Sequence, residues 1–453
     1  MQKIGQYEVL KEIGQGSLAI VYQAFDPQLR RDVALKILHP IFSKNQKNIE
    51  RLRQEAQTLA QLDHPHILRI YSFLDQEEAK GIVTEYVQGQ TLAQFLEKHS
   101  PVLPEIGLRI IADILEALEH AHSRKIVHRD IKPENIIINT SGEIKIADFS
   151  IAKIMGKESL TLTGQLVGSP FYLSPEQAVG EKVDERADLF SVGVLLFRLV
   201  TGDAPFMDQD PAVLLKKILT SAPPRPTQLN PKISKSLERI LLKALEKDRA
   251  KRYQKAWEFR YDILNSLKEY GLSLEEIELN RYFETPKEYE AQFLLFLTQH
   301  YVEEGLFAFK AKQFEKASCL WNRVLEYDPH HLEVRKHLRR LSRHHFFSFS
   351  KHIVFGIGFA VFALVIYLLF TRETNLSQTP KPVVEWAYLT INKDPETKFF
   401  LNDEFQGLVP KTPLKLPVGS YQVRFEKKGF KPVLGAITLK SGETSVINIK
   451  RGE

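Results

Sequence analysis

Residues 353–370 restrict the architecture of this chain more than any other stretch, because eighteen consecutive positions carry no charged side chain. A helix of about this length is the minimum that crosses the hydrocarbon core of a bilayer. A buried helix of a globular core usually keeps a polar stripe, whereas here only two glycines and Tyr367 interrupt the apolar side chains. We therefore expect one transmembrane helix at 353–370.

Charged residues around this run indicate its orientation. The basic side chains on its N-terminal side are Arg335, Lys336, Arg339, Arg340, Arg343 and Lys351. On its C-terminal side Arg372 is close, and Glu373 balances its charge. Because cytoplasmic flanks carry the excess of Lys and Arg, we expect residues 1–352 in the cytoplasm and 371–453 outside the cell membrane. The first residues of the chain also lack the apolar run of a secretory signal.

Composition narrows the function classes. The 453 residues exceed what one hydrophobic core holds, so two or more domains are expected. The formal net charge of +6 is modest for this length and gives no reason to expect nucleic-acid binding. The single cysteine, Cys319, excludes an intramolecular disulfide and a cysteine-rich metal site. We expect Cys319 to pack as a helix residue and not to act as a nucleophile.

The N-terminal part has the pattern of two lobes. Strand-like runs at 7–13, 32–38 and 81–87 come early, and long amphipathic helical runs follow up to about residue 268. This order predicts an α+β architecture with a small β-rich lobe and a larger helical lobe.

Residues 290–343 have a helical pattern of their own. Small, aromatic and proline residues occur there at the offsets of one tetratricopeptide-like helical hairpin: Gly305, Ala317, Trp321 and Pro329. A lone hairpin of this kind cannot bury its own apolar face. We expect it to pack on the N-terminal lobes or on another chain; the alternative is a helical spacer that leads to the membrane.

The C-terminal part has the pattern of a polar linker, 371–384, and a small all-β domain, 385–453. Alternating apolar and polar residues predict short strands such as those at 387–392, 398–401, 421–427 and 445–450. Turn residues separate them at 402–403, 417–419 and 428–429.

Three segments of this part, TPL at 412–414, LPVGSY at 416–421 and EKKGF at 426–430, resemble the PEGA domain family of bacterial surface-associated proteins. At 395–398 this sequence has Pro-Glu-Thr-Lys in place of the tetrapeptide that gives the family its name. The resemblance implies a binding or wall-contact module with an unknown extracytoplasmic ligand.

Five short motifs follow one another in the N-terminal part: GQGSLAIV at 14–21, VALK at 33–36, HRDIKPEN at 128–135, DFS at 148–150 and SPE at 174–176. Their joint order and spacing resemble the eukaryotic-like Ser/Thr protein kinase family over residues 7 to about 265. The resemblance implies a bilobal protein kinase domain at 7–268. It also implies transfer of the γ-phosphoryl group of ATP to Ser or Thr of protein substrates, with Mg²⁺ or Mn²⁺ as the metal. Lys132 favours the Ser/Thr branch of the family over its tyrosine branch.

Phosphoryl transfer explains why such residues are needed. Its transition state is loose and carries charge on the equatorial oxygens, so the protein mainly holds phosphates and metal in place and orients the hydroxyl. Gly14 and Gly16 let backbone amides approach the phosphates, which a Cβ would hinder. The third glycine of the family pattern is Ala19 here, the smallest substitution.

By resemblance, Lys36 holds the α- and β-phosphates and pairs with a helix glutamate, for which Glu55 is our choice and Glu50 the alternative. Asp130 accepts the proton of the substrate hydroxyl, and Lys132 neutralises the transferring phosphate. Oxygen ligands for magnesium come from two residues: Asn135 and Asp148.

The nucleotide pocket is also assigned by resemblance. Its residues are Ile13 and Val21 beside the glycine loop, Glu85, Tyr86 and Val87 at the hinge, and Thr84 at the back. Three residues have supporting roles: Asp188 braces the catalytic loop, and Arg252 pairs with Glu176.

The activation segment, 149–176, carries the departures and the expected switch. Ser150 replaces the glycine of the family pattern, and its Cβ restricts positive φ, so we expect altered switching more than lost chemistry. A phosphate on this segment would bind Arg129. Its candidate acceptors are Ser159, Thr161 and Thr163, and Ser169 is expected to contact the catalytic Asp and Lys.

The domain order resembles that of a receptor-type bacterial kinase. It suggests that the outer β-domain binds a ligand, that chains form a homodimer and that the kinase domains phosphorylate one another. Ala19 and Ser150 keep a rival hypothesis open, a nucleotide-binding pseudokinase scaffold. A structural anchor between membrane and envelope is the third hypothesis.

Overall fold

The computed structural model describes residues 3–16, 19–43, 46–77, 79–149, 170–341, 385–392, 396–410 and 412–448. The chain divides into two compact units, residues 1–350 and 351–453. Among the described residues, no helix is both long enough and apolar enough to span a bilayer. The predicted span at 353–370 and the linker at 371–384 lie outside the described residues.

A six-stranded antiparallel sheet forms the small lobe of the first unit, with strand order β1-β2-β3-β4-β6-β5. Its strands are β1 (Lys3–Ile4), β2 (Tyr7–Gln15), β3 (Ala19–Asp26), β4 (Arg31–Leu38), β5 (Ile70–Asp75) and β6 (Lys80–Glu85). After the short α1 (Pro40–Ser43), α2 (Gln46–Leu59) packs Leu52 and Ala56 against Ala19, Leu38 and Ile82. The three strands predicted early in the sequence are thus present.

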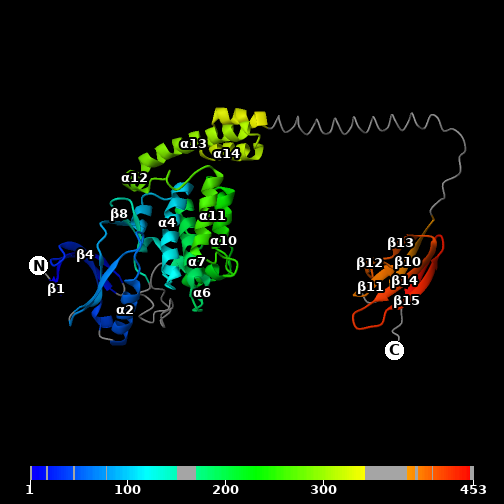
Figure 1. The fold of residues 1–453 in the computed structure, drawn as a ribbon, viewed down its shortest axis with the longest axis horizontal. Helices are drawn as coiled ribbons and strands as arrows, with labels where there is room; N and C mark the ends of the chain where they lie inside the picture. The colour runs from blue at the N-terminus through cyan, green and yellow to red at the C-terminus, as the bar shows by residue number, and fades with distance from the viewer. Residues whose placement is uncertain are drawn as a thin grey trace. The chain divides into compact units, whose positions relative to one another are not determined.

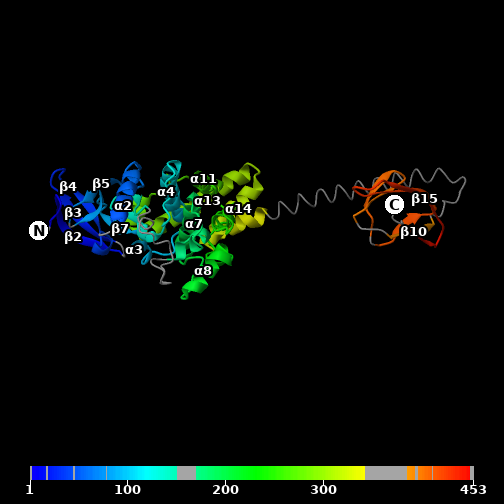
Figure 2. The same ribbon diagram turned by 90° about the horizontal axis from the view of Figure 1, so that it is seen from below.

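Helices build the large lobe. They are α3 (Leu92–Leu96), α4 (Pro104–Ser123), α6 (Pro175–Ala178), α7 (Glu185–Thr201), α8 (Pro211–Thr220), α9 (Pro226–Leu229), α10 (Lys235–Ala244) and α11 (Ala256–Glu269). Most residues of α4 and α7 are buried, so these two helices form the centre of the lobe. A small sheet of β7 (Gly89–Thr91), β8 (Ile136–Asn139) and β9 (Ile144–Ile146) lies between this core and the small lobe. Figures 1 and 2 both show the β-rich lobe at one side of the helices, the predicted bilobal arrangement.

A helical extension follows the large lobe. It comprises α12 (Leu279–Glu284), α13 (Pro286–Lys310), α14 (Phe314–Tyr327) and a helix at 332–341. α13 and α14 form the predicted hairpin, with the first helix starting at Pro286 rather than near 290. Gly305 is required where the two helices meet, because an added Cβ would lie 2.3 Å from Nε1 of Trp321.

The extension packs on the large lobe. Its buried side chains belong to the same hydrophobic core as those of α4, α7, α10 and α11. In α13 this apolar stripe recurs every four residues, at Tyr289, Phe293, Leu297 and Tyr301. Over the described residues 290–341 the hairpin therefore packs on the large lobe, one of the two expected surfaces, and is not a free helical spacer. Cys319 is exposed on α14, so our expectation that it packs is wrong.

The second unit is all-β, as predicted. One sheet has the order β13-β10-β16 and the other β12-β11-β14-β15. Its strands are β10 (Trp386–Asn392), β11 (Lys398–Leu401), β12 (Glu404–Leu408), β13 (Leu414–Pro417), β14 (Gly419–Glu426), β15 (Val433–Leu439) and β16 (Thr444–Asn448). Both sheets contribute to one core, with Leu389 and Val423 among its buried residues. Asn402 and Asp403 have φ of 50° and 67°, the conformation of a tight hairpin turn between β11 and β12.

Candidate active site

The loop between α4 and β8 is held by one buried carboxylate, that of Asp188 in α7. Its oxygens accept the backbone N–H groups of His128 at 2.8 Å and Arg129 at 2.7 Å, and they contact His122 Nε2 at 2.8 Å. Burial acts to raise the pKa of Asp188, but these bonds outweigh it and hold that pKa below the usual value of 3.8. The expected brace is present.

This brace holds a backbone that most residues avoid. Arg129 has φ of 69° and Asp148, at the facing loop, has φ of 62°. Left-handed conformations of non-glycine residues persist only where the surrounding structure fixes them, and they cluster at functional sites. A further bond that the motifs did not indicate, from Gln177 Nε2 to the carbonyl of Arg129 at 2.7 Å, fixes the same loop.

Gln177 could have been found from the sequence. Ser174 and Gln177 form a capping box at the start of α6, the S-x-x-Q pattern of a helix N-terminus. That pattern predicts the position of the glutamine, whereas its bond to a residue far along the chain depends on the fold.

Asp130 lies in this loop with its carboxylate held by two neighbours. Lys132 Nζ is 2.7 Å from Oδ2 of Asp130. Asn135 Nδ2 donates to the same oxygen at 2.9 Å and to the Asp130 carbonyl at 2.7 Å. The side chain of Asp130 remains 42% exposed. Three residues predicted for catalysis and metal binding are therefore in one cluster, with an accessible carboxylate at its centre.

Lys36 and Asp148 join the two lobes. Lys36 lies in β4, where it pairs in register with Val21 of β3 and Ile82 of β6. Its Nζ is 2.6 Å from Oδ1 of Asp148, which follows β9. Desolvation acts to raise the pKa of Asp148, but the Lys36 ammonium outweighs it and lowers that pKa.

The structure tests only in part the prediction that a helix glutamate lies beside Lys36. Glu55 is half-buried at the edge of the apolar face of α2, whereas Glu50 is exposed. This favours Glu55 over Glu50. Its pairing with Lys36 stays a prediction.

The glycine turn connects β2 and β3. Gly14 pairs with Val21, and the Gly16 N–H donates to the Ala19 carbonyl at 2.8 Å. An added Cβ at Gly14 would meet nothing within 4 Å. The fold itself therefore does not require this glycine, which leaves open space where the phosphates are predicted. Ile13 before it is 43% exposed.

A cavity lies behind Lys36. Its polar lining is Lys36, Thr84 and Asp148, and the rest is apolar: Leu59, Leu62, Ile67, Leu68, Ile70, Ile82, Ile146 and Phe149. Thr84 thus lines a cavity together with Lys36, and its place at the back of the nucleotide pocket stays a prediction.

The hinge follows Thr84. The Glu85 side chain contacts Lys145 at 2.8 Å, and its N–H donates to the Arg69 carbonyl at 2.9 Å. Tyr86 and Val87 are half-buried. The side chain of Glu85 is therefore engaged in an ion pair. Recognition of a base by the backbone of this hinge stays a prediction.

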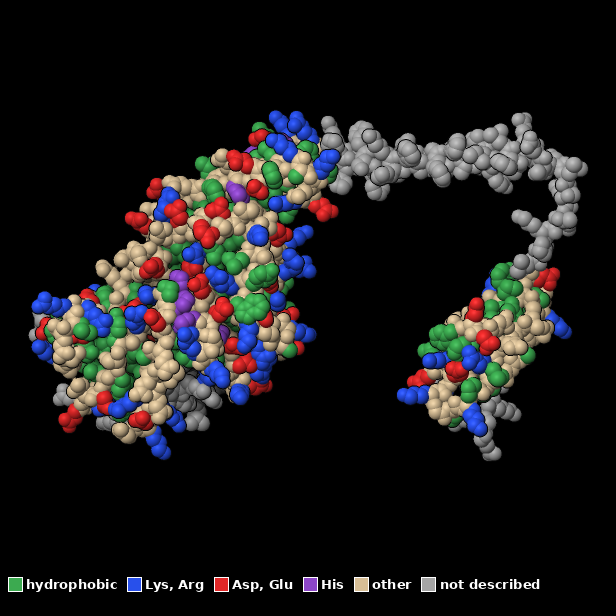
Figure 3. Space-filling view, in the orientation of Figure 1, with side chains coloured by type: hydrophobic (Ala, Val, Ile, Leu, Met, Phe, Trp, Pro, Cys, Tyr) green, Lys and Arg blue, Asp and Glu red, His purple; other side chains and the backbone are tan. Residues whose placement is uncertain are grey.

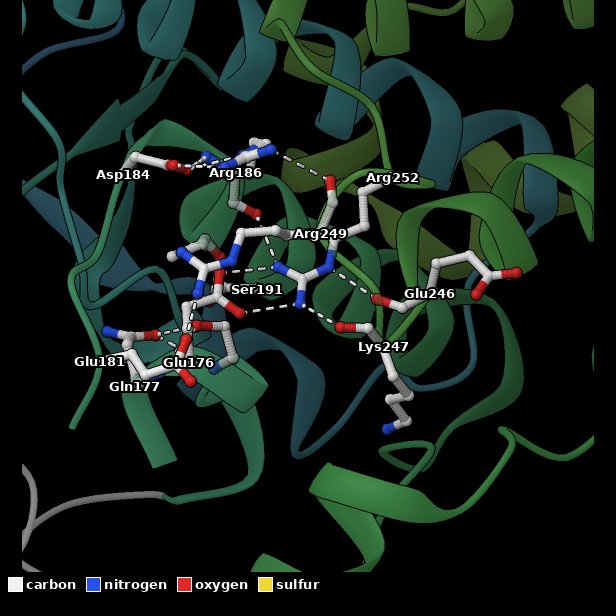
Figure 4. Close-up of polar contacts among 12 residues, drawn as sticks. Glu176, Gln177, Glu181, Asp184, Arg186, Ser191, Glu246, Lys247, Arg249 and Arg252 are labelled. Atoms are coloured by element: carbon white, nitrogen blue, oxygen red, sulfur yellow. Dashed lines mark hydrogen bonds and ion pairs between the residues drawn. The ribbon is translucent and has the colours of Figure 1, made fainter. Parts of the chain in front are cut away.

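A buried ion pair supports the site from the large lobe (Figure 4). Arg252 Nη1 and Nη2 donate to the two carboxylate oxygens of Glu176 at 2.7 and 2.8 Å. Arg252 Nε also donates to the carbonyl of Glu246 at 2.6 Å. This confirms the predicted pair, which fixes α6 and with it Gln177.

Several predicted residues lie outside the described residues: Ser150, Ser159, Thr161, Thr163 and Ser169. Within the described residues, no group of three or more His, Cys, Asp and Glu side chains is arranged to hold a metal ion. Metal binding by Asp148 and Asn135 therefore stays a prediction.

The chain matches the protein kinase domain family over residues 7–260, more than half of its length, and the PEGA domain family over residues 386–452. It is 40% identical over 259 residues to serine/threonine-protein kinase PrkC of Bacillus subtilis, covering 57% of this chain and 40% of that protein. It is 37% identical over 265 residues to serine/threonine-protein kinase PknB of Mycobacterium tuberculosis, covering 57% of this chain and 42% of that protein. The chain thus spans about two fifths of the length of these relatives.

Among solved structures, the PknI kinase domain of Mycobacterium tuberculosis is 28% identical, with a TM-score of 0.47. The match covers 58% of this chain and 96% of that one.

Proposed function

Because the chain belongs to the protein kinase domain family, we propose that it transfers the γ-phosphoryl group of ATP to Ser or Thr side chains of proteins. The observation that carries the proposal is the cluster around Asp130, whose carboxylate is accessible and held by Lys132 and Asn135. A carboxylate so held can accept the proton of a substrate hydroxyl as that oxygen attacks phosphorus.

The residues present fit ATP and a divalent metal. Asp148 and the Oδ1 atom of Asn135 are hard oxygen ligands of the kind that Mg²⁺ or Mn²⁺ takes, since Nδ2 of Asn135 is engaged with Asp130. Bound metal would supply charge neutralisation between the phosphates. Lys36 would hold the phosphates from β4, and the amides around Gly14 and Gly16 would approach them without a Cβ in the way.

The adenine would bind between Ile13 and Val21 on one side and the hinge on the other. The backbone of Glu85 and Val87 would make its polar contacts, because the Glu85 side chain is engaged by Lys145. Glu55 would orient Lys36 from α2.

The test is transfer of labelled phosphate from ATP to a general protein substrate in the presence of Mg²⁺, followed by identification of the modified amino acid. We expect phosphoserine or phosphothreonine, and loss of label with Lys36→Met. Nucleotide binding without any transfer would overturn the proposal in favour of a scaffold.

Membrane anchoring is the second part of the proposal. The uncharged run at 353–370, with basic residues before it, supports a single-pass protein with a cytoplasmic kinase domain and an extracytoplasmic β-domain. Extraction of the full chain and of a 353–370 deletion with carbonate tests it: the full chain should stay in the membrane pellet and the deletion should not. A full chain that is released would overturn it.

Signalling through the β-domain is the third part. The domain order supports a homodimer whose kinase domains phosphorylate the activation segment of each other after the outer domain binds its ligand. Autophosphorylation in membranes should fall when residues 353–453 are removed. A monomeric chain with the same activity in both forms would exclude this part and leave the kinase activity standing.

A further inference from the structure

The helix at 332–341, the last described element of the first unit, has two different faces. Val334 and Leu341 are buried, and the ring of His337 stacks on Trp321 with centroids 4.9 Å apart. Four basic side chains lie on the other face and are exposed: Arg335, Lys336, Arg339 and Arg340.

These four residues form two pairs at i, i+4 spacing, so they share one side of the helix. Like charges at this spacing repel each other and destabilise a helix. The one carboxylate in the helix sequence, Glu333, contacts His337 at 3.5 Å. We call Arg335, Lys336, Arg339 and Arg340 the basic face. Figure 3 shows Lys and Arg side chains gathered at this end of the first unit.

The basic face is rigidly attached to the kinase body. The buried side of its helix packs on α14, and α14 is bonded to α4 of the large lobe through Arg323 and Glu105 at 2.7 Å. A basic segment in a flexible linker would only add attraction to a surface. A basic face held by the same core as the catalytic loop would also fix how the kinase body is oriented on that surface.

We infer that the basic face binds the anionic headgroups of the phospholipid bilayer that carries the proposed transmembrane helix. Clusters of Lys and Arg next to a span are attracted to anionic lipid, and each contributes appreciably near the surface. Residues 342–352 separate the helix from the uncharged run. Even fully extended, these residues span at most about 40 Å. The tether therefore keeps the basic face at high effective concentration beside the bilayer. This inference rests on the proposed membrane anchoring.

The first test uses residues 1–345, which lack the uncharged run and lie within a separate compact unit. Co-sedimentation is measured with vesicles of phosphatidylcholine alone and with vesicles containing about a third phosphatidylglycerol. We expect binding only to the anionic vesicles, lost between about 0.1 and 1 M salt, where the Debye length falls from about 10 to 3 Å.

A four-Gln variant replaces every residue of the basic face: Arg335→Gln, Lys336→Gln, Arg339→Gln and Arg340→Gln. It should bind the anionic vesicles at least about tenfold more weakly than the unaltered protein does. A matched control removes the same charge from exposed lysines elsewhere: Lys182→Gln, Lys216→Gln, Lys235→Gln and Lys251→Gln. The control should bind the anionic vesicles like the unaltered protein. Equal loss in both variants, or equal binding to neutral vesicles, would overturn the inference.

Three further readouts separate the possible failures and extend the test to the full chain. Labelled phosphate transfer to a soluble substrate should be unchanged in the four-Gln variant, so a dead kinase would count against the proposed function and not against the basic face. Competition with double-stranded DNA tests whether the basic face binds nucleic acid. If DNA displaces the anionic vesicles at equal charge concentration, the lipid inference is overturned and nucleic acid is the ligand. In the full chain, amides of 332–341 should exchange more slowly in anionic than in neutral nanodiscs.

Discussion

Arg323 in α14 and Glu105 in the first turn of α4 form a buried ion pair, with Nη2 and Oε1 2.7 Å apart and side chains only 4% and 3% exposed. Tyr327 donates its hydroxyl to Glu105 at 2.7 Å and Tyr301 does so at 3.2 Å. This polar centre joins the helical extension to the helix that leads into the catalytic loop.

We predict that Arg323→Met destabilises residues 1–345 by about 3–5 kcal/mol, because it leaves the Glu105 carboxylate buried without its cation. Urea unfolding measures the effect. The double variant Glu105→Gln, Arg323→Met should lose less than the single variant, since the buried charge of Glu105 is removed together with that of Arg323. A single variant within about 0.5 kcal/mol of the unaltered protein would contradict this account.

Removal of the extension should destabilise the kinase domain. A fragment that ends at residue 268 loses the apolar cover supplied by side chains such as Tyr282, Phe293 and Leu297. Each large apolar side chain contributes about 1.5–3 kcal/mol when buried. We expect a melting midpoint lower by about 10 °C or more than that of residues 1–341, or aggregation. Equal midpoints in scanning calorimetry would mean that the extension is dispensable.

Asp188→Asn should lower the free energy of unfolding by about 1–3 kcal/mol. The reason is that the amide NH₂ would face N–H groups whose hydrogen bonds the carboxylate accepts. The pKa of Asp188 is held below its usual 3.8, so the unfolded chain takes up its proton first as the pH falls. The stabilisation is complete above about pH 5 and is lost below 3.8. The difference in unfolding free energy between the two proteins should therefore shrink as the pH falls below 3.8. A difference that grows in acid would contradict it.

A histidine cluster should make the fold sensitive to mild acid. The ring of His64 is 5.6 Å from that of His66 and 5.2 Å from that of His120. Burial and these two neighbours lower the pKa of His64, while Glu116 acts against them and Lys145 with them.

A lowered histidine pKa means that the unfolded chain binds the proton first, so stability falls as pH drops below 6.5. We predict that His64→Gln reduces the loss of melting temperature between pH 7 and 5.5. A variant with an unchanged or steeper pH dependence would show that His64 does not cause it.

The sequence predicted local elements well where alternation or motif order was strong. The strands at 7–13 and 32–38 and the pair Glu176–Arg252 are examples. The strands named from the sequence do not include β12, β13 and β15 of the second unit. In β15, VLGAITL, apolar side chains lie on both sides and Leu434 is 74% exposed, so no alternation marks the strand.

Contacts between residues far apart in the chain could not be predicted from the sequence. Arg323 and Glu105 are 218 positions apart, and neither residue type at its place indicates the other. The site shows the same limit. The ion pair of Lys36 with Asp148 was not predicted, because it forms only where the two lobes bring β4 and the end of β9 together. Motif spacing predicts which residues are used, and packing decides which of them touch.

The most direct test of the central claim compares Asp130→Asn with the unaltered chain for ATP affinity and for the rate of phosphate transfer. The affinity for Mg²⁺-ATP should be unchanged, because Asp130 holds the substrate hydroxyl and not the nucleotide. The transfer rate should fall by about 10²–10⁴-fold, the range expected when a general base is lost. An unchanged transfer rate in Asp130→Asn would show that Asp130 is not the general base of a phosphoryl transfer.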